Sequence, residues 1–162
     1  MLAALFEFKA KSNREILSDL AKSGLDASHP DGLTAIRTMN HTHVVDQIFR
    51  AHLTGTTHRY AAANTPETPA LADLATHISE LDAWYIEYAA SLTAAQLQEQ
   101  IVFTFTDGKP GRMSREEMLL HVITHGAYHR GAVGLILFRQ GTTPPAETFT
   151  RYLHEAEPAR RQ

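Results

Sequence analysis

The segment from Ser114 to Gly141 reads SREEMLLHVITHGAYHRGAVGLILFRQG and carries signals for both the start and the end of a helix. Ser114 followed by Glu117 forms the capping-box pattern that begins a helix, and Gly141 is typical of a helix end. Apolar residues recur between these ends at three- and four-residue spacings: Leu119, Leu120, Val122, Ile123, Val133, Ile136 and Leu137. The pattern predicts a helix of about 25 residues.

The same spacing predicts three long helices earlier in the chain, over residues 2–23, 31–55 and 69–92. Asp31 suits the N-cap of the second, and Thr68 before Pro69 suits the N-cap of the third. Four long helices in sequence predict an all-α protein with a four-helix bundle.

Two shorter segments complete the predicted fold. Residues 101–106 are rich in β-forming side chains and precede the turn sequence Asp107-Gly108, so we expect a short β-hairpin or an extended loop before the last long helix. A short helix is expected over 147–155. We therefore predict a single domain over residues 1–157 and a frayed tail over 158–162.

Composition narrows the class of protein. The chain has 162 residues with 15 basic and 18 acidic side chains, a net charge of −3, and no basic cluster of the kind that binds nucleic acid. No apolar run is long enough to span a membrane, and the first residues lack the pattern of an export signal, so we expect a cytoplasmic protein. Cysteine is absent, whereas histidine occurs ten times. Any thiol chemistry must therefore use a thiol from outside the chain.

His121, His125 and His129 follow one another at four-residue steps, which places them on one helix face about 6 Å apart along the axis. Either adjacent pair suits a metal ion. The metalloprotease motif His-Glu-Xaa-Xaa-His has the same spacing, but Val122 and Gly126 stand where its glutamate would be. The sequence therefore argues against a protease of that kind.

A third ligand is expected from the second helix. His41 is in phase with the apolar residues of that helix and is predicted to point inward, whereas His43 is predicted to lie on a solvent-facing side and His52 near the rim. His41, His125 and His129 would give three neutral nitrogen donors and leave one side of a metal free. Zinc or nickel is favoured, with manganese, iron or copper left open. His121 remains a candidate fourth ligand, proton carrier or pocket wall.

These residues resemble the DinB family, also called the DinB/YfiT-like metalloenzymes. The resemblance rests on Asn40-His41, Asp46, Ile48-Phe49, Leu53 and Gly55, and on the stretch HVITHGAYHRG over residues 121–131. It implies an up-down-down-up bundle, a homodimer, and a divalent metal held by His41, His125 and His129. Characterised members include thiol-dependent enzymes that use bacillithiol or mycothiol, among them S-transferases and a maleylpyruvate isomerase.

Other side chains near the predicted site are candidates for further roles. Tyr128, Arg130 and His121 are candidate catalytic residues, and Arg130 is also a candidate for binding the carboxylate of a thiol cofactor. Asp46 is expected to pair with a cation such as Arg130 across the bundle. The aromatic group Trp84, Tyr85 and Tyr88 is expected in the core or in a dimer interface.

The leading interpretation is a metal-dependent enzyme that joins a low-molecular-weight thiol to a small electrophile. Two alternatives remain: a metal-dependent hydrolase that activates water, and a non-catalytic dimeric module that binds a metal or a small ligand. The sequence provides no evident inward carboxylate beside the histidines to serve as a base, which weakens the hydrolase interpretation.

Overall fold

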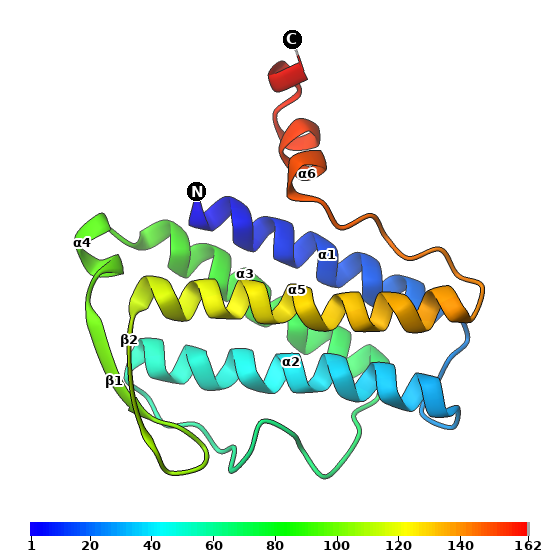
Figure 1. Ribbon diagram of the computed structural model, residues 1–162, viewed down its shortest axis with the longest axis horizontal. Helices are drawn as coiled ribbons and strands as arrows, with labels where there is room; N and C mark the ends of the chain where they lie inside the picture. Colours follow the sequence, from blue (N-terminus) through cyan, green and yellow to red (C-terminus); the bar gives the residue numbers. More distant parts are fainter. Residues whose placement is uncertain (162) are drawn as a thin grey trace.

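A computed structural model describes residues 1–161 of the chain. Four long helices form a bundle, and the remaining elements lie at its ends and on one side (Figure 1). The elements in chain order are α1 (Leu2–Lys22), α2 (Pro30–Thr54), α3 (Leu71–Ser91), α4 (Ala94–Leu97), β1 (Gln100–Thr104), β2 (Pro110–Ser114), α5 (Arg115–Arg139), α6 (Phe149–Ala156) and the 3-10 helix η1 (Pro158–Arg161). The four-helix bundle is confirmed. The tail predicted over 158–162 forms η1 as far as residue 161, and residue 162 lies outside the described residues.

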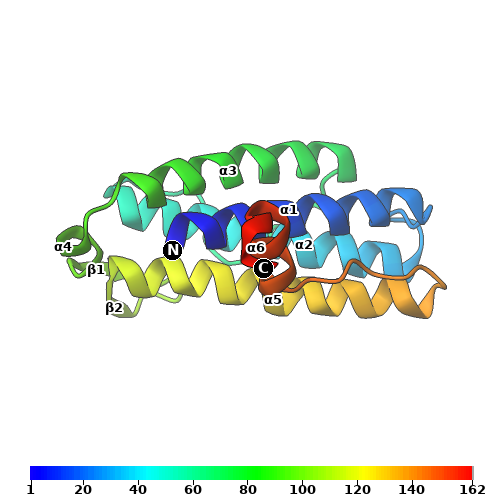
Figure 2. The ribbon, with the colours of Figure 1, turned by 90° about the horizontal axis from the view of Figure 1, so that it is seen from above.

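The long helices follow an up-down-down-up order of directions. Figure 1 shows α1 and α5 running one way along the bundle and α2 and α3 the other way, with the segment between α2 and α3 passing back along the outside of α2. Seen from above, α3 and α5 form the two edges of the bundle with α1 and α2 between them (Figure 2). The bundle therefore brings α2 against α5, the two helices that carry the predicted ligands.

Of the two alternatives expected before α5, a short hairpin or an extended loop, the structure has the hairpin. Strands β1 and β2 pair antiparallel, with Phe103 opposite Gly111. A Cβ on Gly111 would lie 2.6 Å from Cζ of Phe103, so only glycine lets this ring fold over the neighbouring strand. The Phe103 ring is thereby buried against the end of α2, where it lies beside Phe49 and His52.

Some helix ends lie where the sequence predicts them, and others do not. The capping box of α5 is confirmed, because the Ser114 amide donates to Glu117 at 2.6 Å and the Glu117 amide donates back to the Ser114 hydroxyl at 3.1 Å. Helix α2 has its N-cap two residues earlier than expected: His29 takes the place of Asp31, and Pro30 is the first helical residue. Helix α3 begins later, at Leu71, because the Thr68 hydroxyl accepts a hydrogen bond from Arg37 instead of capping the helix.

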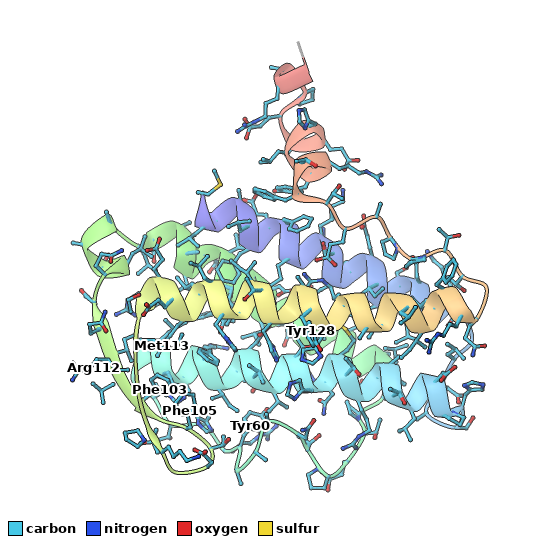
Figure 3. The ribbon with its side chains drawn as sticks, in the orientation of Figure 1. Tyr60, Phe103, Phe105, Arg112, Met113 and Tyr128 are labelled. Carbon is cyan, nitrogen blue, oxygen red and sulfur yellow. The ribbon has the colours of Figure 1, made fainter. Side chains whose placement is uncertain are left out.

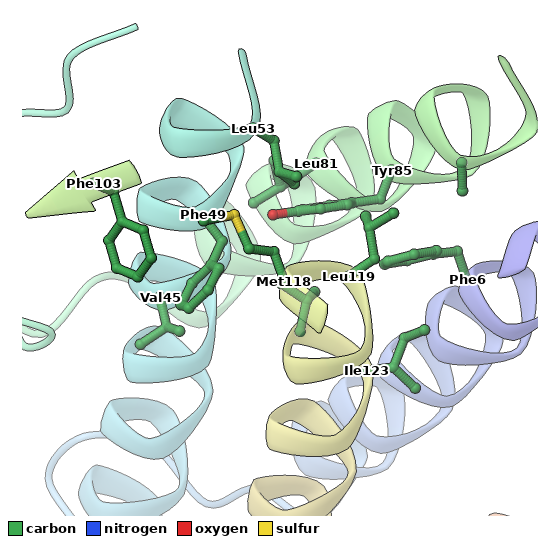
Figure 4. Packing of buried hydrophobic residues seen from close by; sticks show 12 residues of the cluster. Phe6, Val45, Phe49, Leu53, Leu81, Tyr85, Phe103, Met118, Leu119 and Ile123 are labelled. Carbon is green, nitrogen blue, oxygen red and sulfur yellow. The ribbon is translucent and has the colours of Figure 1, made fainter. Parts of the chain in front are cut away.

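Two apolar clusters fill the bundle, one towards each end. The cluster at the hairpin end contains Phe6, stacked on Tyr85 at 5.0 Å, and Met118 from α5 (Figure 4). The other cluster includes Leu20, Met39 and Val133. Of the predicted aromatic group, Tyr85 is fully buried in the core, whereas Trp84 and Tyr88 are half-buried. None of the helices in residues 1–161 is both long and apolar enough to cross a membrane.

A layer of buried polar side chains separates the two clusters along each helix. Lys9 of α1 is fully buried, with its Nζ 2.8 Å from Asp46 of α2 and 2.6 Å from Asp82 of α3. Asn13 donates to the second oxygen of Asp82 at 2.7 Å and accepts from Arg130 of α5 at 2.9 Å. The layer therefore links all four long helices.

Asp46 pairs with a cation across the bundle, as expected, but the cation is Lys9 and not Arg130. The sequence contained a signal for this arrangement, since Lys9 and Asn13 fall in phase with the apolar residues Phe6 and Leu17. Burial raises the pKa of Asp46 to about 6, and the Lys9 ammonium limits this rise. Burial alone would lower the pKa of Lys9, but the two carboxylates outweigh it and raise that pKa.

We predict that Lys9→Met destabilises the fold by about 3–5 kcal/mol, because it leaves two buried carboxylates without their cation. Chemical denaturation followed by circular dichroism measures this change. The matched control is Lys22→Met, at a lysine whose side chain is 74% exposed and whose substitution should change stability by less than about 0.5 kcal/mol. Equal stability of the two variants would show that the buried polar layer contributes little to the free energy of unfolding.

Candidate metal centre

Three histidines meet where α2 and α5 pack together. His41 comes from α2, and His125 and His129 come from successive turns of α5. One ring nitrogen of each lies within 4.8 Å of the others, and the Nε2 of His125 is 3.2 Å from that of His41 and 3.1 Å from that of His129. Nitrogen ligands about 2.0–2.1 Å from a tetrahedral zinc ion lie roughly 3.3 Å apart. Two of the three separations match this value and the third lies within 4.8 Å, so the three nitrogens could hold one metal ion.

A backbone carbonyl fixes the tautomer of His41. Its Nδ1 lies 3.0 Å from the carbonyl oxygen of Ala63, in the segment that returns along α2. A carbonyl oxygen only accepts, so Nδ1 carries the proton and Nε2 presents a lone pair to the other two rings. Metal-ligating histidines are commonly oriented by such a hydrogen bond at their second nitrogen.

The remaining nitrogens also favour a cation. The Nε2 of His125 faces two other Nε2 atoms, and a proton on it could satisfy only one of them at a time. The Nδ1 of His125 is buried and has no hydrogen-bond partner among residues 1–161. A cation at the point where the rings converge would satisfy all three lone pairs together.

The local electrostatics keep the rings in the ligating form. Burial, with smaller contributions from His129, His121 and His41, lowers the pKa of His125 to about 3. Burial and the neighbouring His41 also lower the pKa of His129. Both rings are therefore neutral at pH 7, as metal binding requires.

No acidic side chain takes part in this group, which is the one cluster of potential ligands found within residues 1–161. Three neutral donors leave the full charge on a divalent ion and one position free. The arrangement suits chemistry in which the ion lowers the pKa of an incoming group.

Two candidate catalytic residues, Tyr128 and His121, lie beside the three histidines. The Tyr128 ring is 76% exposed and meets His129 edge-on at 5.1 Å between centroids. Figure 3 shows Tyr128 over the line along which α2 and α5 meet. His121 lies outside the converging group, with its ring stacked between Phe49 and His125.

Arg130 faces away from the histidines. Its side chain is almost fully buried, with Nε and Nη2 donating to Glu147 at 2.9 and 2.5 Å and Nη1 donating to Asn13. Gly126 makes room for it, since a Cβ there would lie 2.9 Å from Nη1. The guanidinium therefore joins α5 to α1 and to the segment that follows α5.

The expected solvent-facing position of His43 is wrong. Its ring is 7% exposed, lies parallel to that of His77 at 6.2 Å and contacts the Gln47 side chain. Burial lowers the pKa of His43 to about 4. The segment between α2 and α3 covers this side of α2: Tyr60 donates to Gln47, and Thr65 accepts from Asn40. His52 lies at the rim, half-buried beside Phe103 and His58.

The comparisons with known proteins agree with this fold. The DinB family model matches residues 1–161, so the chain belongs to the DinB family. A crystal structure of a DinB-like protein from Bacillus cereus ATCC 10987 is similar, with a TM-score of 0.63 and 18% sequence identity. The similarity covers 86% of this chain and 91% of that one. No curated protein matches this chain.

We predict that the purified protein binds about one zinc ion per chain and that His41→Ala, His125→Ala and His129→Ala each abolish binding. Elemental analysis after dialysis measures the metal content, and circular dichroism checks the fold. The control is His77→Ala, which removes an exposed histidine of α3 and should leave the metal content unchanged. Full metal content in all three ligand variants would disprove the site.

Proposed function

We propose that this protein is a metal-dependent S-transferase, which joins a low-molecular-weight thiol to a small electrophile. The observation that carries the proposal is the group of three neutral imidazoles with no acidic ligand. A divalent metal bound there would lower the pKa of a thiol and favour its thiolate. The metal is expected to be zinc or nickel, with manganese, iron or copper as alternatives.

The reaction would balance as a simple substitution. The thiol sulfur loses its proton, forms a bond to the electrophilic carbon, and the leaving group departs with the bonding electrons. The chain has no cysteine, so the sulfur must belong to an external thiol. His41, His125 and His129 would hold the metal, and Tyr128 and His121 are the candidates for carrying the proton. Arg130 would act only through the position of α5, because its guanidinium is held by Glu147 and Asn13.

Metal-dependent hydrolysis is the second candidate, with water in place of the thiol. It is less favoured because a hydrolase commonly needs a carboxylate base, and none joins the histidine cluster in the described chain. A third candidate is a dimeric module that binds a metal or a small ligand without turnover.

We also propose that the protein is a homodimer and works in the cytoplasm. The family resemblance supports the dimer. The cytoplasm suits the proposed reaction, because thiols are kept reduced there.

An assay separates the three candidates. We expect the zinc-loaded protein to accelerate conjugation of a thiol with 1-chloro-2,4-dinitrobenzene, measured by absorbance, and His125→Ala to fall to the uncatalysed rate because the site cannot hold metal. His77→Ala is the control and should retain full activity. Zinc-dependent cleavage of ester or amide substrates instead would favour the hydrolase. Neither activity in a protein that holds its zinc would favour the binding module.

A further inference from the structure

The outward face of α5 has no charged side chain over five helical turns. Its exposed residues are Leu120, Thr124, Ala127, Tyr128, Gly131, Ala132, Leu135 and Phe138. Leu135 and Phe138 are 50% and 66% exposed. A surface helix normally carries charged residues on its solvent side, and a continuous exposed apolar strip indicates a binding surface.

Contacts within the chain explain two of the three glycines of α5 but not the third. Gly126 makes room for Arg130, and Gly134 lies against Pro144, whose Cβ is 3.4 Å from the position of an added Cβ. Gly131 has nothing within 4 Å of that position and has ordinary helical geometry. Glycine costs about 1 kcal/mol relative to alanine inside a helix. No contact within the chain explains Gly131, whereas close approach of another molecule would.

We propose that this face binds the same face of a second copy, with the two α5 helices antiparallel about a two-fold axis. This inference rests on the proposed homodimer and assigns its interface. In that register Leu120 lies opposite the partner's Phe138, and Thr124 lies opposite the partner's Leu135. At the centre, Ala127 lies opposite the partner's Gly131.

The order of side-chain sizes supports a second copy as the occupant. A two-fold axis brings each residue against its counterpart from the other end of the strip, so the large residues Leu120 and Phe138 meet at the ends, and at the centre Ala127 and Gly131 lie beside the exposed Tyr128. The small side chains of Ala127 and Gly131 leave space there for the Tyr128 rings of the two copies. The Thr124 hydroxyl donates to the carbonyl of Leu120, which leaves its methyl group for packing. The strip offers no charge to attract a charged partner.

The first test is the oligomeric state, measured by light scattering and sedimentation. The wild type should be a dimer, and Ala127→Glu should weaken association at least about 100-fold, because it places a charge in the centre of the interface. Ala72→Glu introduces the same charge on the exposed side of α3 and should leave the dimer intact. A monomeric wild type would overturn both the dimer and its interface. A dimeric Ala127→Glu variant would overturn the interface alone.

Cross-linking tests the register. The chain has no cysteine, so an equal mixture of Leu120→Cys and Phe138→Cys proteins should form a mixed disulfide on oxidation. Leu120→Cys alone should not cross-link, because an antiparallel arrangement separates the two copies of this position. Efficient cross-linking of Leu120→Cys alone would indicate parallel helices and would overturn the proposal. Zinc content, measured in parallel, reports on the histidine site independently.

A second inference concerns how His125 is held, and it rests on the proposed metal site. His41 is fixed by the Ala63 carbonyl, but the Nδ1 of His125 has no partner within residues 1–161. Its ring is instead stacked on that of His121, at 5.2 Å between centroids and 18° between planes. His121 is in turn stacked on Phe49 of α2, at 4.5 Å and 24°.

We infer that His121 is a positioning residue that orients His125 by ring stacking. Phe49 belongs to the same helix as His41, so the stack Phe49–His121–His125 also sets the separation of the ligands on α2 and α5. Stacking of this kind requires a flat ring but does not require a ring nitrogen. This distinguishes it from the two chemical roles that His121 could have as a fourth ligand or a proton carrier.

Metal titration tests this inference. His121→Ala should weaken zinc affinity about tenfold or more, as loss of an orienting neighbour typically does, and His121→Phe should restore most of it. His77→Ala, at an exposed histidine of α3 outside the stack, is the control. Equal loss in His121→Ala and His121→Phe would show that a nitrogen is needed, and no loss in either would show that stacking is dispensable. Failure of the wild type to bind zinc would instead disprove the metal site itself.

Discussion

The buried ammonium of Lys9 is the constraint on which the bundle depends. It lies between Asp46 and Asp82 and so joins α1 to α2 and α3, while Asn13 extends the layer to Arg130 of α5. Buried charges cost several kcal/mol each unless they are paired in good geometry. One relative placement of the four helices pairs every charged side chain of this layer, whereas apolar clusters alone would tolerate small shifts. The layer therefore fixes the register of the bundle.

This register has a direct consequence for the histidine site. Lys9 and Arg130 pack beneath Gly126, the residue that follows His125. Asp46 ties α2 to α1, and Asn13 ties α1 to Arg130 of α5. These contacts set the separation of α2 and α5 at the level of the polar layer without a metal ion. Sites assembled from different helices need such support, since displacements of a few tenths of an ångström weaken coordination. The polar layer and the candidate metal centre are therefore two parts of one arrangement.

Three sides of helix α5 face three different surroundings. Its inner side contributes Val122 and Val133 to the core, its second side carries His125 and His129 towards α2, and its outer side is the uncharged strip from Leu120 to Phe138. A helix that is apolar on nearly every side gives a weak amphipathic pattern. The sequence of α5 therefore does not indicate which side faces solvent, and the packing of the bundle shows which side stays exposed.

The sequence by itself determined the helices and the hairpin, the capping box at Ser114, and the pairing of His125 with His129, because these depend on contacts within a few residues along the chain. Only the tertiary structure decided that Lys9 pairs with Asp46, that Arg130 binds Glu147, and that His43 is buried. These outcomes depend on which helix faces meet and on the segment that returns along α2. Periodicity identifies a buried face, but it does not identify the element that covers it.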